Sequence, residues 1–175
     1  MPGYVCPECG LDYDTISPSD AAVAIRTMPR RYRSSIAVAL EDDADEGLIR
    51  RRPDESTWSA LEYTAHVADL YQLFTTIVRR MFDEDTPTIA FWDPDARAAE
   101  QNYNGADPVA VLNHLDAATA TLAAAVERVD ADSWRRTATF SFGERDLLRM
   151  VRNAVHEGSH HLRDVGRSLD AARGR

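Results

Sequence analysis

The sequence predicts an all-α protein built as a bundle of four long helices. Apolar residues recur at helical spacing over four long stretches, so each stretch can bury one face and expose the other. Strand-like alternation is confined to one short segment. Because long amphipathic helices without a sheet must bury their apolar faces against one another, a bundle is the expected architecture.

Capping residues and proline delimit the first two helices. A Ser-Pro-Ser-Asp sequence supplies a capping hydroxyl and an acidic first turn, which predicts a first helix over about 17–40. Pro29 lies inside it and is expected to kink or split it, because proline removes one backbone hydrogen bond. Ser56 and Thr57 predict the start of a second helix, over about 58–83.

The last two helices have equally clear starts. Asp107 and Pro108 give an N-cap and a proline at the first helical position, which predicts a third helix over about 107–129. A fourth helix is expected over about 144–171. The polar segment 130–143 contains a short alternating run, so we expect a loop or a small hairpin there.

A long segment between the second and third helices, about 85–105, shows little periodicity. Long loops in compact domains are often functional, which makes Phe91, Trp92 and Tyr103 candidates for the lining of a pocket. Packing of this loop onto the bundle explains the same aromatic residues equally well.

Composition limits the possible partners and the number of domains. With 175 residues the chain suits one bundle domain, 17–175, preceded by a short cysteine-containing segment, 1–16. A net charge of -9 argues against nucleic acid or an anionic membrane as partner, because phosphate binding needs clustered cations. No apolar run reaches the roughly 18 residues of a membrane span, and no signal peptide is visible, so we expect a cytoplasmic protein.

The segment 1–16 contains Cys6-Pro7-Glu8-Cys9-Gly10, a turn that commonly supplies half of a tetrahedral zinc site. No second CxxC or CxxH follows. Cys6 and Cys9 therefore either bind a second metal with ligands from elsewhere, serve in redox chemistry, or are free thiols in a reducing compartment.

Three histidines are the main candidates for metal ligands. His156 and His160 are four residues apart, which places two imidazoles on the same side of a helix, one turn apart. They lie nearly opposite the apolar stripe of that helix, on a face that looks toward a polar cleft or solvent. His66 lies near the centre of the apolar stripe of the second helix, so it faces the interior. A bundle interior is a usual place for metal sites.

Three motifs, in this order, make the chain resemble an actinobacterial branch of the DinB/YfiT-like superfamily. They are the Cys-Pro-Glu-Cys-Gly opening at 6–10, the Trp-Ser-Ala-Leu-Glu-Tyr-Thr-Ala-His-Val segment at 58–67, and the His-x-x-x-His-His-Leu-x-Asp-Val segment at 156–165. Mycothiol-dependent maleylpyruvate isomerases and bacillithiol transferases belong to the same superfamily. The likeness covers nearly the whole chain.

The resemblance implies a four-helix bundle of up-down-down-up type, often a homodimer, with a divalent metal ion held by His66, His156 and His160. Members with a known activity use the metal to activate a low-molecular-weight thiol for transfer or isomerisation. The CxxC opening and the lack of an obvious extra C-terminal domain distinguish this chain from the isomerases, so the resemblance does not identify its small-molecule substrate.

Three imidazoles leave at least one coordination position open, as in a catalytic zinc or nickel site, where the metal lowers the pKa of a bound water or thiol. Glu62 and Asp164, each one turn from a candidate ligand, are candidates to accept the free ring N–H groups. Exposed helix carboxylates paired with nearby arginines explain both residues equally well. His161 is turned about 100° from His160 and should line the pocket instead of binding the metal.

Two functions follow from this sequence. The first is a metal-dependent, mycothiol-type S-transferase or isomerase. The second is a non-catalytic metal-binding or stress-response protein with a vestigial site. An open cleft beside the histidines favours the enzyme, and a filled site favours the second function.

Overall fold

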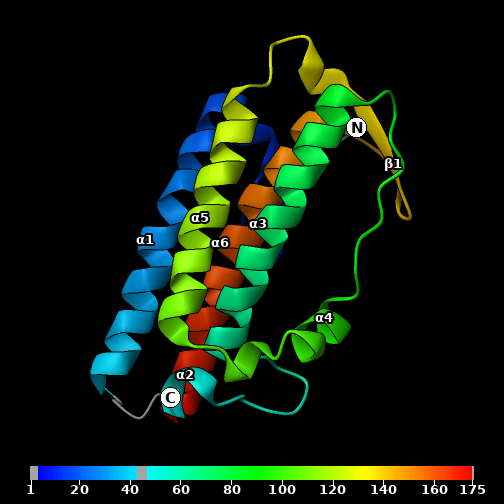
Figure 1. Ribbon diagram of the computed structural model, residues 1–175. Helices are drawn as coiled ribbons and strands as arrows, with labels where there is room; N and C mark the ends of the chain where they lie inside the picture. Colours follow the sequence, from blue (N-terminus) through cyan, green and yellow to red (C-terminus); the bar gives the residue numbers. More distant parts are fainter. Residues whose placement is uncertain (1–3, 43–46, 175) are drawn as a thin grey trace.

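The computed structural model describes residues 4–42 and 47–174 and confirms the predicted bundle, in which four long helices lie side by side (Figure 1). The helices are α1 (Pro18–Asp42), α2 (Gly47–Arg50), α3 (Ala60–Asp83), α4 (Pro94–Glu100), α5 (Pro108–Glu127) and α6 (Leu147–Ala172). Two short helices, α2 and α4, lie in the connections at the end of the bundle that holds the C-terminus of the chain (Figure 1).

Each of α1 and α3 packs against both α5 and α6, while α1 and α3 touch little, so they lie on a diagonal of the bundle. The core between them is apolar, and its largest fully buried side chains come from α1, α3 and α5, with Ile49 added from α2. Burial of each such side chain contributes about 1.5–3 kcal/mol, which is why the amphipathic pattern determines the arrangement. These side chains include Ile25, Met28, Tyr32, Ile36, Leu61, Tyr71, Phe74, Ile77, Met81, Leu115 and Leu122.

Helix α1 is continuous through Pro29, so the predicted kink or split does not divide it. Helix α3 begins a little later than predicted. Ser59, not Ser56 or Thr57, is the N-cap, and it forms a capping box in which its hydroxyl accepts from the Glu62 N–H. Asp54 accepts hydrogen bonds from the hydroxyls of both earlier residues, which holds them in a turn.

The start of α5 is as predicted, with Asp107 as N-cap and Pro108 in the first turn. The start of α6 is later than predicted, because residues 143–146 form a strand. Strands β1 (Thr137–Phe140) and β2 (Gly143–Asp146) pair as an antiparallel hairpin, and Asp146 then caps α6. The hairpin expected as one alternative for the segment 130–143 is therefore present.

Among the described residues, α5 alone is long and apolar enough to cross a membrane by length and composition. Half of its most apolar window is buried inside the protein, where α5 packs on α1 and α3. The core helix of a bundle has this character without a membrane.

Three helices approach one another closely at Gly158, which lies between His156 and His160 on α6. A Cβ at this position would clash with the Tyr71 hydroxyl and press on Met28. The Tyr32 hydroxyl also donates to the Gly158 carbonyl at 2.9 Å. The missing side chain therefore lets α1 and α3 support the helix at the point where both histidines project.

Replacing Gly158 by alanine should destabilise the protein, because the added methyl group must displace a buried tyrosine. Overpacking of this kind costs about 1–3 kcal/mol. The expected fall in Tm is roughly 2–12 °C, measurable by calorimetry. Gly166→Ala is the matched control, since nothing lies within 4 Å of a Cβ there and alanine favours a helix over glycine. Equal Tm shifts in the two variants would contradict this account.

Candidate metal centre

The N-terminal segment folds as a compact turn around its two cysteines. The Cys6 N–H donates to the Leu11 carbonyl at 3.0 Å, and the Gly10 N–H donates to the Cys6 carbonyl at 2.8 Å. Gly10 has φ +74, a conformation that glycine adopts without steric cost. The tight turn brings both thiols to one side of the segment.

This segment covers the polar face of α6. The Tyr13 hydroxyl donates to the Asn153 side-chain oxygen at 2.8 Å, and Arg152 Nε donates to the Ile16 carbonyl at 2.9 Å. The face that the sequence left toward a cleft or solvent is thus covered by chain from the opposite end of the sequence. The side chains of His156 and His160 are only 12% and 19% exposed as a result.

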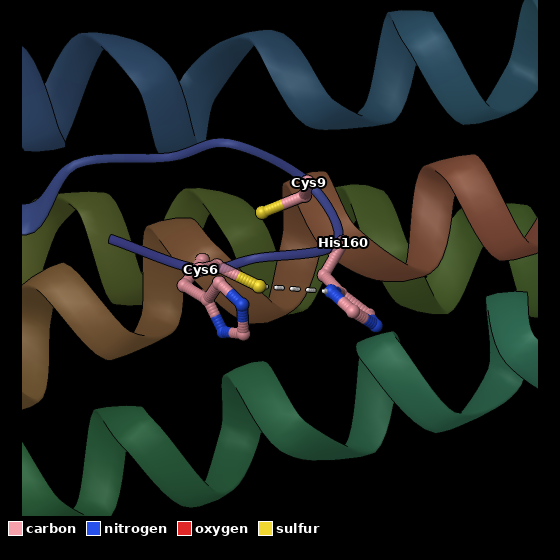
Figure 2. A group of neighbouring side chains, drawn as sticks. Cys6, Cys9 and His160 are labelled. Carbon is pink, nitrogen blue, oxygen red and sulfur yellow. Dashed lines mark hydrogen bonds between the residues drawn. The ribbon is translucent and has the colours of Figure 1, made fainter. Parts of the chain in front are cut away.

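Cys6, Cys9, His156 and His160 come together at this junction. One ligand atom from each lies within 4.8 Å of those from the other three, and the described part of the chain holds no other such group of three or more cysteines, histidines or carboxylates. Cys6 Sγ lies 3.7 Å from His160 Nδ1. Figure 2 shows both cysteine side chains on the N-terminal loop and His160 on α6 beside them.

Each histidine of the group has a carboxylate at its other nitrogen. His156 Nδ1 lies 3.3 Å from Glu157 Oε1, and His156 Nε2 is buried with no hydrogen-bond partner. His160 Nε2 lies 3.5 Å from Asp164 Oδ2 and 3.6 Å from Glu8 Oε2. Metal-binding histidines commonly donate their second N–H to a carboxylate in this way, which leaves one lone pair for the metal. The orphaned nitrogen of His156 fits that role.

The environment favours a thiolate at Cys6. The backbone N–H of Cys9 and, to a smaller extent, the side chains of His156 and His160 together lower the pKa of the Cys6 thiol to about 6, against the effect of burial. Burial raises the pKa of Cys9. Because the thiolate is the form that binds metals, Cys6 is the more prepared of the two ligands.

His66 lies outside this group, in a buried aromatic pocket. Its ring centroid is 4.9 Å from that of Trp58, 5.6 Å from that of Trp92 and 5.0 Å from that of His161. Its Nδ1 atom is buried without a hydrogen-bond partner. Burial, and then the charge of His161, lower the pKa of His66 to about 3, so its ring is neutral at pH 7.

His161 is held between two carboxylates. Its Nδ1 lies 2.9 Å from Asp164 Oδ2 and its Nε2 lies 3.2 Å from Glu157 Oε2. Although burial opposes the charge, these contacts raise the pKa of His161 to about 9, and His156 and His161 hold the pKa of Glu157 well below its usual range. We call His66 and His161 the inner histidine pair. It adjoins the Cys–His group, since the ring centroids of His160 and His161 are 5.5 Å apart.

The two carboxylates expected behind the ligands lie in different places. Asp164 is beside His160 and His161, as described above. Glu62 closes the capping box of α3, and its oxygens accept from Arg52 and from the Ser59 N–H. The structure therefore gives Glu62 a role in the helix start and no hydrogen bond to His66.

The aromatic residues of the long loop also differ from one another. Trp92 packs against His66, whereas Phe91 packs with Phe74, Phe140 and Phe142. Tyr103 donates to Asp69 at 2.7 Å and lines a cavity of about 580 Å³ together with Trp58 and Glu62. The Trp58 ring thus touches both this cavity and His66.

Sequence reasoning missed several residues that complete the site: Glu8, Tyr13, Asn153 and Glu157. Glu157 had a readable signal, because it follows His156 directly and precedes His161 by one turn. Tyr13 had none, since its partner lies 140 residues away.

A helical bundle with two cysteines and two histidines gathered at one point defines a candidate metal-binding protein. A comparison with protein families identifies the relatives of this chain. Residues 31–165 match the family model of the DinB superfamily. The chain belongs to the DinB superfamily, as its motifs predicted.

Solved structures share the fold. One is YfiT from Bacillus subtilis, described as a probable metal-dependent hydrolase with an unusual four-helix bundle topology. It has a TM-score of 0.79 at 16% identity, with 91% of this chain and 90% of that chain covered. Another is the mycothiol-dependent maleylpyruvate isomerase, with a TM-score of 0.67, 18% identity and 88% of this chain covered. This chain spans 62% of the isomerase. No curated protein matches the chain.

Proposed function

We propose that this protein binds one zinc ion through Cys6, Cys9, His156 and His160. The observation behind the proposal is that the four ligand atoms lie within 4.8 Å of one another. In a tetrahedral site with normal bond lengths, a sulfur and a nitrogen ligand are about 3.6 Å apart. The distance of 3.7 Å between Cys6 Sγ and His160 Nδ1 fits that spacing. Two thiolates and two imidazoles are a donor set that favours zinc.

Four protein ligands fill the coordination sphere of tetrahedral zinc, which is typical of a structural site. This supports the non-catalytic function among the two that the sequence suggested. In this role the ion fastens the N-terminal segment to α6, and the carboxylates of Glu157 and Asp164 orient the two imidazoles.

Cobalt substitution tests both the ligands and the closure of the site. Protein refolded with Co²⁺ should show the absorption of a four-coordinate site with thiolate ligands, at one ion per chain. Added low-molecular-weight thiol should leave that spectrum unchanged if the site is closed. An octahedral spectrum without thiolate charge-transfer bands would contradict the proposal.

A metal-dependent, mycothiol-type S-transferase or isomerase is the second candidate, and the buried, unpartnered Nδ1 of His66 favours it. In this arrangement His66, which lies outside the group of His156 and His160 in this structure, has to join them to hold the ion, zinc or nickel, and a position is left open for the thiol. The unpartnered Nδ1 of His66 and the cavity beside Trp58 support a site that receives a small molecule. The mycothiol-dependent isomerase among the structures of the same fold supports the choice of thiol.

Metal content and thiol conjugation, measured on the same His66→Ala protein, separate the two candidates. With the four-ligand site, this variant should keep its zinc, and the wild type should conjugate no thiol. With the three-histidine site, the variant should lose both its metal and the thiol conjugation that the wild type shows. The cytoplasmic location and the homodimer stay predictions from the sequence.

A further inference from the structure

A cavity of about 540 Å³ lies near the N-terminus of α6, outside the Cys–His group. Its walls come from the hairpin, from the 3₁₀ turn Ser133–Arg135, from the first two turns of α6 and from Asp14. Four arginines line it: Arg135, Arg145, Arg149 and Arg152. With its three carboxylates, the lining carries four positive and three negative charges, a small positive excess in a chain with a net charge of -9.

Two of the three acidic residues that line the cavity already have a partner in the protein. Asp146 is the N-cap of α6 and accepts from the Arg149 N–H at 2.7 Å. Asp14 lies 3.6 Å from Arg152. Glu144, which is exposed, is the third carboxylate of the lining.

Three of the arginines have no ion pair with a carboxylate in the described parts of the chain. Arg145 donates only to the carbonyls of Glu144 and Phe142. Arg149 lies over the Tyr13 ring, at 4.2 Å from its centroid, and Arg135 is exposed. A guanidinium presents several N–H donors in a planar fork that matches carboxylate and phosphate oxygens. The Arg135 and Arg149 side chains donate no hydrogen bond within the described parts of the chain, so their donors can bind an anion that enters the cavity.

The cavity and the Cys–His group share one face of α6. Arg149 and His156 are seven residues apart, which corresponds to about 10.5 Å along the helix and nearly the same direction around it. Tyr13 connects them, because its ring also lies 5.6 Å from the His156 ring. When the N-terminal segment packs on α6, it therefore brings the Tyr13 ring against the Arg149 side chain.

We propose that this cavity binds a small organic anion through its carboxylate or phosphate group, with Arg149 and Arg135 as the main contacts and Trp134 as an apolar wall. The concave shape and the acidic surface elsewhere select a small anion over nucleic acid, because an extended polyanion would be repelled by the remaining charge. This cavity shares no residue with the proposed zinc site, and the binding of an anion in it does not depend on bound zinc.

Calorimetric titration of the metal-loaded protein tests the proposal with two probes, succinate and inorganic phosphate, at low chloride concentration. At least one should bind saturably, with one site per chain, and the comparison tells a carboxylate site from a phosphate site. Arg149→Met and Arg135→Met should each weaken binding by at least about ten-fold, since each removes a charge-assisted contact. Arg30 is exposed on α1, outside the cavity, so Arg30→Met is the matched control and should bind the anion as the wild type does.

Several outcomes would overturn the proposal. Saturable binding of neither probe is one, and equal affinity in the wild type and both cavity variants is another. Arg135 is exposed, so its variant should fold normally even if Arg149→Met does not. Zinc content is measured on every sample. A zinc-loaded protein that binds no anion refutes this inference alone, whereas anion binding by a protein without zinc refutes only the proposed zinc site.

Discussion

Serine in place of Cys6 should reduce the zinc content from about one ion per chain to nearly none. The serine hydroxyl is a poor zinc ligand, and three remaining donors, of which Cys9 has a raised pKa, do not hold the ion through gel filtration. Elemental analysis of the purified protein measures the effect. Cys9→Ser should behave in the same way.

The controls for this experiment are two other histidines. His66→Ala and His161→Asn should keep the metal, because neither residue belongs to the four-ligand group. His156→Ala should lose it, but this loss is expected for the three-histidine site as well and therefore does not discriminate. Full zinc content in Cys6→Ser, together with its loss in His66→Ala, would replace the four-ligand site by the three-histidine one.

Removal of zinc should lower the stability of the protein strongly. A ligand present at about 1,000 times its Kd stabilises the folded state by about 4 kcal/mol. For a chain of this size, that corresponds to a fall in Tm of roughly 8–16 °C when a chelator is added. Differential scanning calorimetry with and without the chelator measures the change, and limited proteolysis should show new cleavage within residues 4–16.

The Cys6→Ser/Cys9→Ser double variant is the control for the chelator. It should unfold at the temperature of the chelated wild type and should not respond to the chelator itself. If the wild type unfolds at the same temperature with and without the chelator, the ion does not fasten the N-terminal segment to the bundle.

The long helices could be predicted because their signals are local. The N-cap Asp107 with Pro108 placed the start of α5, and the apolar stripe of α3 placed His66 in the interior. The predicted start of α6 was three residues too early, because the residues of β2 are almost all polar and exposed. Such a sequence looks the same as the first turn of an exposed helix. A strand of this kind is defined by its partner, β1, and not by its own residues.

The candidate site was only half predictable for a related reason. The spacing of His156 and His160 and the CxxC turn are local patterns, and each indicated an incomplete metal site. Their meeting depends on a contact across more than 140 residues, which no helical or strand period encodes. The available signal was that the CxxC turn lacked two zinc ligands and that His156 and His160 lay on a polar face without further ligands beside them. Each half supplies the two ligands that the other lacks.

The distance along the chain between these two halves has a consequence for the order of folding. A link between Cys6 and His160 closes a loop of 154 residues, and on a chain-entropy model a cross-link of that length contributes about 5 kcal/mol. During synthesis both thiols emerge long before either imidazole, so an ion at the proposed site cannot find its four ligands until α6 has been made. At the proposed site, zinc capture is then a late event of folding, and it marks a chain in which the N-terminal segment has already met α6.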